Sequence, residues 1–445
     1  MWKQKNKAFS KRFFLRQFIL LFLLSYAGIG HLNSQVITLK DTVKFMTYNL
    51  LNYGNTTTYC TTGNNNIATK DQHLKVIIQH VQPDILVVNE MGCNTVYGRR
   101  ILTNCMNIGT FKYKSGTMFA STGQDLCNLI FYNSELFELV DQKEINKNAA
   151  NQSMIRSAGD YRLYYKSPGL SEHKDSSTLR VITTHLKAGN GSSESMTRGL
   201  EAEIIMETVS ANPSNANYIL AGDLNLYRSS ETAWSNFTNY TQAEFNFKDP
   251  INQIGSWTSN SSYAKYHTQS TTTSSNGCQS GGGMDDRFDF ILASTSVMNG
   301  SNKVKILPET YQALGQDGNR YNQSIDNPTN TSVPSAVVLA LATLSDHLPV
   351  VTDLEITYSS ETKDTSTSIS ALTTSPIIII NPSHALTISG LAENVHIELI
   401  DLSGQVVHSG VYSADKNIGS NLPKGIYLLR FENNKTQETY KWVKE

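Results

Sequence analysis

The feature of this sequence that most constrains its fold is a series of short apolar runs, each of which resembles a β-strand. Several of these runs end at or beside a polar residue, and amphipathic helical segments lie between some of them. This alternation predicts a layered α/β domain in which helices cover β-sheets. Strand ends in such a domain can bring polar groups from distant parts of the chain into one cleft.

Strands are expected at residues 43–50, 84–89, 127–132, 179–185, 218–221, 287–292 and 350–356. Helices are expected at 70–82 and 196–209, where apolar residues recur at helical spacing. Pro83 should end the first of these helices. Residues 258–283 are rich in Ser, Thr, Asn and Gly, which predicts a long mobile loop beside the cleft.

The polar residues at the strand ends form a chemically coherent set. In chain order they are Asn49, Glu90, His185, Asp223, Asn225, Asp289, Asp346 and His347. Carboxylates with an amide suit a hard cation such as Mg²⁺ or Mn²⁺. Histidines can hold a phosphoryl group or transfer a proton near neutral pH. Each residue alone has a structural explanation as a turn, rim or core residue, but the whole set predicts metal-assisted attack of water on a phosphate ester.

The same ordered series, with Arg287-Phe288-Asp289 and Ser345-Asp346-His347 as its last motifs, resembles the endonuclease/exonuclease/phosphatase superfamily over residues 36–357. The resemblance implies an α/β (α+β) four-layer sandwich, with two central β-sheets flanked by helices and the site at one sheet edge. It implies a divalent metal held chiefly at Glu90, with Asn49 and Asp346 near it.

The resemblance also implies roles for the remaining residues. His347, paired with Asp289, would act as general base or as a phosphate-stabilising acid. His185 would contact the phosphate, and Asp223 with Asn225 would act on the nucleophile and the transition state.

Three positions leave alternatives open. Asn89 stands where many members of the superfamily have Gln. Asp286 competes with Asp289 as the partner of His347, and we favour Asp289. For a basic residue on the phosphate we favour Arg156, with Arg162 as the alternative and a surface arginine as the structural explanation of either.

The N-terminus predicts export. A basic segment precedes the apolar run 18–27, which is shorter than the roughly 20 residues of a membrane-spanning helix. Residues 1–34 are therefore expected to be a signal peptide cut after Ser34, with an uncleaved anchor as the alternative. No later segment is apolar enough to span a bilayer. With 37 Lys+Arg against 38 Asp+Glu, the chain has no strongly basic footprint for nucleic acid.

The five cysteines show no zinc-ligand spacing. An oxidising compartment would allow one or two disulfides and leave one thiol over. Cys93 and Cys105 are the nearest pair in the sequence, and we expect a disulfide between them.

A small all-β domain is expected at residues 377–445, after a polar linker at 358–376. Its segments 400–407 and 422–429 resemble the type IX secretion sorting domain of Bacteroidetes; a generic β-sandwich binding module is the alternative. The resemblance implies that the outer-membrane type IX secretion machinery exports the protein to the medium or the cell surface.

The leading functional hypothesis is a secreted nuclease, a Mg²⁺- or Mn²⁺-dependent phosphodiester hydrolase with extracellular DNA or RNA as its substrate. A phosphomonoesterase or a phospholipid headgroup hydrolase could use the same site. An adhesion protein on an inactive hydrolase scaffold ranks last, because every catalytic position holds a competent residue. The sequence predicts no particular oligomeric state.

Overall fold

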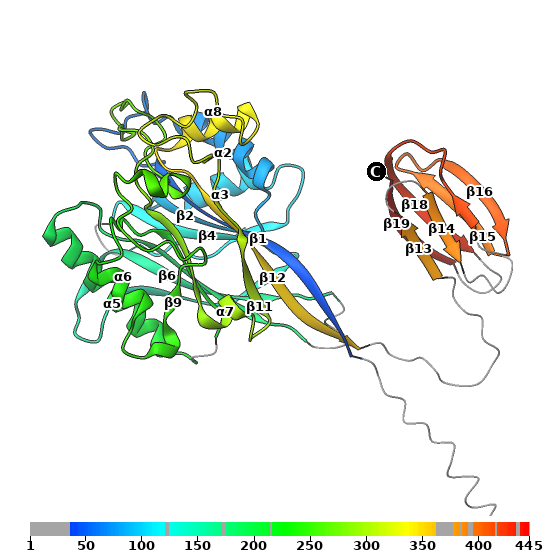
Figure 1. Ribbon diagram of the computed structural model, residues 1–445, viewed down its shortest axis with the longest axis horizontal. Helices are drawn as coiled ribbons and strands as arrows, with labels where there is room; N and C mark the ends of the chain where they lie inside the picture. Colours follow the sequence, from blue (N-terminus) through cyan, green and yellow to red (C-terminus); the bar gives the residue numbers. More distant parts are fainter. Residues whose placement is uncertain are drawn as a thin grey trace, which may run out of the picture. The chain divides into compact units, whose positions relative to one another are not determined.

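The computed structural model (Figure 1) describes residues 36–120, 124–168, 170, 175–213, 216–361, 377–381, 385–389, 395–413, 416–432 and 437–444. The predicted signal peptide and residues 362–376 of the predicted linker lie outside these ranges. The chain divides into two compact units, residues 1–363 and 364–445.

The first unit is built on two six-stranded mixed sheets. Sheet A has the order β11 (Val304–Ala313), β12 (Val350–Glu361), β1 (Val36–Tyr53), β2 (Ile85–Gly92), β4 (Leu126–Asn133), β3 (Tyr113–Ser115). Sheet B has the order β5 (Phe137–Lys147), β6 (Ser153–Tyr165), β7 (Thr178–His185), β8 (Tyr218–Asp223), β10 (Asp289–Ser294), β9 (Phe247–Lys248). One neighbouring pair in each sheet is parallel, β1 with β2 and β7 with β8.

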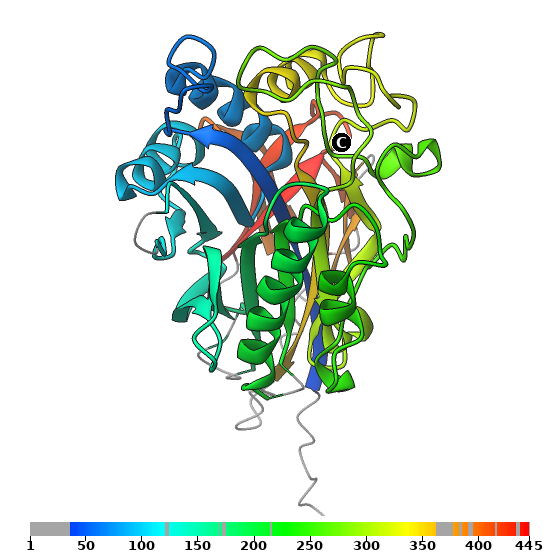
Figure 2. The same cartoon turned by 90° about the vertical axis from the view of Figure 1, so that its left-hand side faces the viewer.

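Helices cover the outer faces of both sheets (Figures 1 and 2). Helices α2 (Ile67–Val81), α3 (Thr95–Ile101) and α8 (Ser335–Leu344) lie over sheet A, and α5 (Ser192–Ser210) and α6 (Thr232–Thr238) lie over sheet B. Apolar clusters fill the space between each helix layer and its sheet, and a third cluster fills the space between the sheets. This confirms the predicted four-layer sandwich.

The strands place alternate residues in different layers of the core. In β1, Phe45 joins the cluster between the sheets, and Met46 joins the cluster under α2 and α8. In β2, Val87 joins the cluster between the sheets, and Leu86 joins the cluster under α2 and α8. Because neighbouring side chains in a strand point to opposite faces, an apolar run without alternation is what a sheet buried on both sides requires.

The expected helices are present with longer bounds, as α2 and α5. Asn66 caps α2 with its side chain, and Gln82 ends it in the left-handed conformation directly before Pro83. Several elements were not expected. They are the helices α3, α6, α7 (Thr295–Asn299) and α8, the short helical segments η1 (Leu102–Met106), η2 (Ala243–Phe245) and η3 (Ser261–Tyr266), and the strands β3, β5, β6, β9 and β11. All seven expected strands are present, and β12 continues to Glu361.

Two expectations need correction. Residues 258–283 are not a solvated mobile loop, because the segment contains η3 and fully buries His267 and Thr271.

The expected Cys93–Cys105 disulfide is wrong. Cys93 bonds Cys127, which lies on a neighbouring strand, and Cys60 bonds Cys278. Cys105 is buried as a free thiol. Sequence proximity failed here because sheet pairing sets which cysteines meet.

The second unit contains two antiparallel sheets. One has the order β13 (Ile377–Asn381), β14 (Ala385–Ser389), β17 (Lys416–Ile418), and the other β16 (Val406–Tyr412), β15 (Val395–Asp401), β18 (Gly425–Glu432), β19 (Gln437–Lys444). Ile397, Leu399 and Trp442 are buried in its core. The small all-β C-terminal domain is thus confirmed. Within the described ranges, no helix is long and apolar enough to cross a membrane.

Candidate active site

The site lies where the parallel strands of both sheets end. In sheet A, Asn49 of β1 pairs with Asn89 of β2, and Glu90 follows directly. In sheet B, His185 of β7 pairs with Asp223 of β8, and Asp223 in turn faces Asp289, the first residue of β10. Because the ends of these strands meet at one edge of the sandwich, residues far apart in the sequence face each other.

The backbone is shaped to aim these side chains. Glu90 and Asn225 have positive φ angles of 55° and 48°, a conformation that residues other than glycine rarely adopt. The pairing of β2 with β4 shifts register between Val88 and Met91, so Glu90 lies in a bulge. Gly222 has φ of 146°, and a Cβ atom there would lie 1.9 Å from the carbonyl oxygen of Thr184. Strained backbone of this kind is typical of functional sites.

His347 and Asp289 form a buried pair. The Nδ1 atom of His347 donates to Asp289 Oδ2 at 2.7 Å, which leaves Nε2 directed toward Asp223 Oδ2 at 3.8 Å. Burial lowers the pKa of His347, but the Asp289 and Asp223 carboxylates outweigh burial and hold this pKa well above its usual value. The two carboxylates thus favour the protonated form of His347, whereas the amide nitrogen of Gln269, 2.8 Å from Nε2, favours an Nε2 without a proton.

His185 has the opposite character. Burial, with Arg156 and His347 adding, holds the pKa of His185 well below its usual value, so this histidine is neutral. Its Nε2 atom lies 3.5 Å from Asp223 Oδ2 and 3.9 Å from Glu90 Oε1. Two histidines whose pKa values are shifted in opposite directions in one site allow one to act as an acid and the other as a ligand or acceptor.

Asp223 is the central carboxylate. Burial raises the pKa of Asp223 to about 7; the charge of His347 opposes this rise, and Asp289 and Glu90 add to it. Two hydrogen bonds hold its position: the backbone N–H of Asn225 donates to Asp223 Oδ1 at 2.9 Å, and the backbone N–H of Asp223 donates to the side-chain Oδ1 of Asn89 at 3.2 Å. A carboxylate with such a pKa can take a proton from water near neutral pH.

Asn49 links the two sheets through its amide. Its Nδ2 atom donates to Glu90 Oε1 at 3.1 Å and to Asp223 Oδ2 at 3.0 Å, and its Oδ1 accepts from Leu51 N at 2.9 Å. The amide nitrogen, rather than the oxygen that a metal would need, thus faces the two carboxylates. In this geometry Asn49 orients the carboxylates.

Asp346 directly precedes His347 in the chain and is held by the segment before β10. Its Oδ2 accepts from Gln269 Nε2 at 3.2 Å and from Ser280 N at 2.9 Å. Its Oδ1 is buried, and no hydrogen-bond donor within the described ranges reaches it. Ser345 anchors this motif, because its hydroxyl donates to the carbonyl of Asn49 at 2.7 Å and accepts from His347 N at 3.1 Å.

The residues present fit a divalent cation. Glu90, His185 and Asp223 each offer one ligand atom, and these atoms lie within 4.8 Å of one another. The buried, unpartnered Oδ1 of Asp346 is a further oxygen donor. A mixed oxygen and imidazole set suits Mn²⁺ as well as Mg²⁺. Of the predicted ligands, Glu90 falls in this group of three, whereas His185 and Asp223 were expected to act on the phosphate and the nucleophile.

The structure distinguishes between Arg156 and Arg162 as the basic residue near the site, and between two aspartates as the partner of His347. Arg156 donates to the Leu186 carbonyl at 3.2 Å, and so does the Asn225 amide, so Arg156 borders the site. Arg162 pairs with Arg180. Arg180 precedes His185 by about five strand positions, or roughly 16 Å, so Arg162 lies away from the site. Of the two aspartates, Asp289 and not Asp286 bonds His347.

Gln269 is a site residue that the sequence analysis missed. Its Nε2 atom lies 2.8 Å from His347 Nε2, and Gln269 also forms isolated β-bridges with Asp286 and His347. Nothing in the polar sequence around Gln269 distinguishes it from its neighbours.

From the sequence, Asn89 is notable only because many members of the superfamily have Gln at this position. Its amide donates to the Thr184 carbonyl at 3.0 Å and so joins sheet A to sheet B behind the site.

Comparison with known proteins concerns the two units separately. Residues 381–445 match the family model described as the secretion system C-terminal sorting domain. This match confirms the predicted sorting domain, and it indicates export across the outer membrane to a secreted or cell-surface location. No curated protein matches the chain.

Solved structures resemble the first unit. The human Nocturnin catalytic domain with bound sulfate is 15% identical, and the match covers 72% of this chain and 97% of that one with a TM-score of 0.47. TDP2 of D. rerio with a single-strand DNA product is 14% identical over 71% and 99% of the two chains, with a TM-score of 0.45. An endonuclease/exonuclease/phosphatase from Bacteroides vulgatus is 14% identical over 71% and 99%, with a TM-score of 0.42. These likenesses assign no chemistry to the site.

Proposed function

We propose that the first unit is a divalent-metal-dependent phosphoesterase, and that it acts as a nuclease on extracellular DNA or RNA. The observation that carries this proposal is the His347–Asp289 pair beside the cluster of Glu90, His185 and Asp223. When protonated, His347 would anchor an anionic phosphate, and the carboxylates beside it would supply a base for water.

Each residue then has a role that follows from its charge and contacts. Imidazolium His347, held by Asp289, donates a hydrogen bond to a phosphoryl oxygen and stabilises its growing charge. Asp223, the central carboxylate, accepts the proton of the attacking water. Asn225 and Asn49 orient Asp223 through their hydrogen bonds, and Arg156 adds positive charge at the rim.

Glu90, His185, Asp223 and Asp346 would hold the metal, Mg²⁺ or Mn²⁺. A bound divalent cation would polarise the phosphoryl group and lower the pKa of water. Its charge would also offset the repulsion among carboxylates that cannot all be buried ionised without compensation. The sorting domain would deliver the enzyme to the exterior, through interaction with the type IX secretion machinery, where nucleic acid is a source of phosphate.

Hydrolysis by the purified chain tests the proposal. Duplex DNA, single-stranded DNA, RNA, sphingomyelin and an inositol phosphate would be incubated with Mg²⁺, Mn²⁺ or EDTA. We expect nucleic acid to be cut, EDTA to stop the reaction, and His347→Ala to lower kcat by about a hundredfold or more. Cleavage of the lipid or the inositol phosphate alone would show that the substrate is not nucleic acid but one of these phosphate esters. Full activity in EDTA or in His347→Ala would refute the mechanism.

A further inference from the structure

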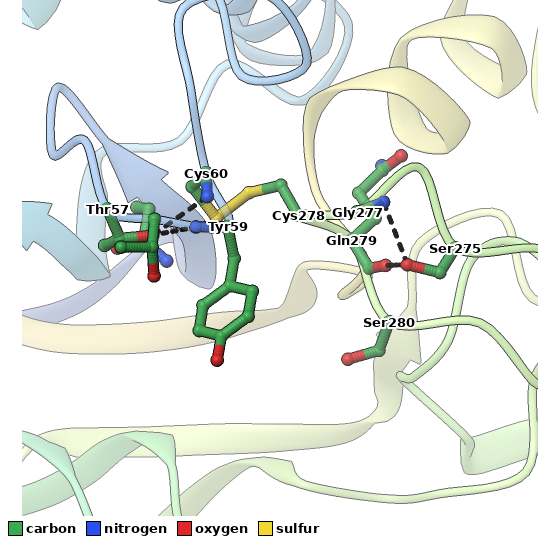
Figure 3. A pocket seen from close by; sticks show the side chains of 10 residues that line it. Thr57, Tyr59, Cys60, Ser275, Gly277, Cys278, Gln279 and Ser280 are labelled. Carbon is green, nitrogen blue, oxygen red and sulfur yellow. Dashed lines mark hydrogen bonds between the residues drawn. A yellow bond between two sulfur atoms is a disulfide. The ribbon is translucent and has the colours of Figure 1, made fainter.

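A pocket of about 560 Å³ lies between the loop that follows β1 and the segment that precedes β10 (Figure 3). The Cys60–Cys278 disulfide joins its two walls. Reciprocal amide hydrogen bonds between Asn64 and Asn276 join the same two segments at 3.2 Å and 3.3 Å. The walls are thus fixed before any ligand arrives, and preorganisation of this kind favours binding because little has to be ordered.

The pocket adjoins the candidate active site through two of its lining residues. The backbone N–H of Asn52 donates to Glu90 Oε2 at 3.2 Å, and the backbone N–H of Ser280 donates to Asp346 Oδ2 at 2.9 Å. Both acceptors are carboxylates of the candidate metal site. A group that enters the pocket therefore lies next to the place where the scissile phosphate would bind.

The lining carries no charged side chain. Its side chains are amides, hydroxyls, the disulfide and one aromatic ring, and none of its residues is Lys, Arg, Asp or Glu. A second phosphate would find no countercharge here, whereas an uncharged group with hydrogen-bonding edges would find donors and acceptors. The ring of Tyr59 is 74% exposed and projects to the same side of the disulfide as the hydroxyl of Ser280 (Figure 3).

We propose that this pocket binds the nucleoside attached to the scissile phosphate, with its base stacked on Tyr59. The inference rests on the proposed nuclease function and specifies its substrate. Aromatic faces stack any base, and the base must be unpaired to present its own face. The pocket thus assigns the enzyme a preference for single-stranded over duplex nucleic acid.

Two matched oligonucleotides test the pocket in the full chain. One is single-stranded DNA, and the other has the same phosphodiester backbone with abasic residues on both sides of the scissile position. Tyr59→Ala should raise KM about tenfold for the base-bearing strand and leave KM for the abasic strand unchanged. Tyr59→Phe keeps the ring and should behave as wild type. Phe111→Ala, which removes an aromatic ring that is 93% exposed and does not line the pocket, is the matched control.

Binding of adenosine, followed by saturation-transfer NMR, separates the pocket from the chemistry. If the protein cuts both strands and Tyr59→Ala changes neither KM, the pocket assignment is wrong while the nuclease stands. If the protein cuts neither strand, adenosine that binds wild type but not Tyr59→Ala supports the pocket without the nuclease. Absence of adenosine binding in that case overturns both.

Discussion

At the scale of single residues, the site depends on which acid holds His347. Asp289, and not Asp286, accepts the Nδ1 proton. Asp289→Asn should therefore lower kcat by about a hundredfold or more, because the amide can no longer hold the imidazolium in place. Asp286→Asn is the matched control and should leave kcat little changed. Steady-state hydrolysis of DNA compares the two, and equal losses would contradict the assignment.

Asp286 should instead affect the free energy of unfolding. Burial raises the pKa of Asp286 to about 6, from a usual value near 4. The folded state thus binds the proton of Asp286 more tightly, so the contribution of this group to stability is greatest at low pH and falls as pH rises through this range. Asp286→Asn should remove this loss and raise the free energy of unfolding by about 1–3 kcal/mol at pH 7.5. Urea unfolding of both proteins at pH 4.5 and 7.5 measures it; a difference between variant and wild type that does not grow with pH would contradict the shift.

At the scale of elements, one buried lysine joins the strand and the helix that carry the site. Lys70 of α2 is 4% exposed, and its ammonium donates to the carbonyls of Leu50, Leu51 and Leu344. These carbonyls lie at the end of β1 and the end of α8, beside Asn49 and Ser345. Lys70 thus fixes the two segments that carry Asn49, Asp346 and His347.

Lys70→Met should leave these carbonyls without a donor. With a cost of about 1–3 kcal/mol for an unsatisfied buried group, the free energy of unfolding should fall by about 3 kcal/mol or more. Because both segments would loosen, kcat should fall as well. Lys75→Met, on the same helix, is the control. Thermal unfolding and kcat that match those of the control would show that Lys70 has no such role.

The elements also show which parts of the site a sequence can reveal. His185, Asp223 and Asp289 were predictable because each ends or begins a buried strand, and strand ends follow from local patterns. Gln269 and Lys70 were not, because their partners lie 78 and 274 residues away in the sequence. Their surroundings depend on packing between layers. The disulfides were missed for the same reason, since Cys60 and Cys278 meet only in the folded unit.

At the scale of the whole molecule, the two disulfides should differ in their contribution to stability. Cys60–Cys278 closes a sequence separation of 218 residues, and Cys93–Cys127 closes one of 34. Loop-closure entropy makes the longer bridge worth about 1.6 kcal/mol more. Cys60→Ser with Cys278→Ser should therefore lower the Tm further than Cys93→Ser with Cys127→Ser. Calorimetry compares them, and the reverse order would contradict the entropic account.

The pairing of the first strand of the unit with its last has a consequence for when activity can appear. β1 pairs with β12 from Val36 to Thr47 against Glu361 to Val350. A growing chain has β1 long before it has β12, and contacts over such a separation form late in folding. Asp346 and His347 are also among the last residues of the unit to be made. A nascent chain that has not yet reached β12 therefore lacks the closing strand and the last residues of the site, and the proposed nuclease would be inactive up to that point without an inhibitor.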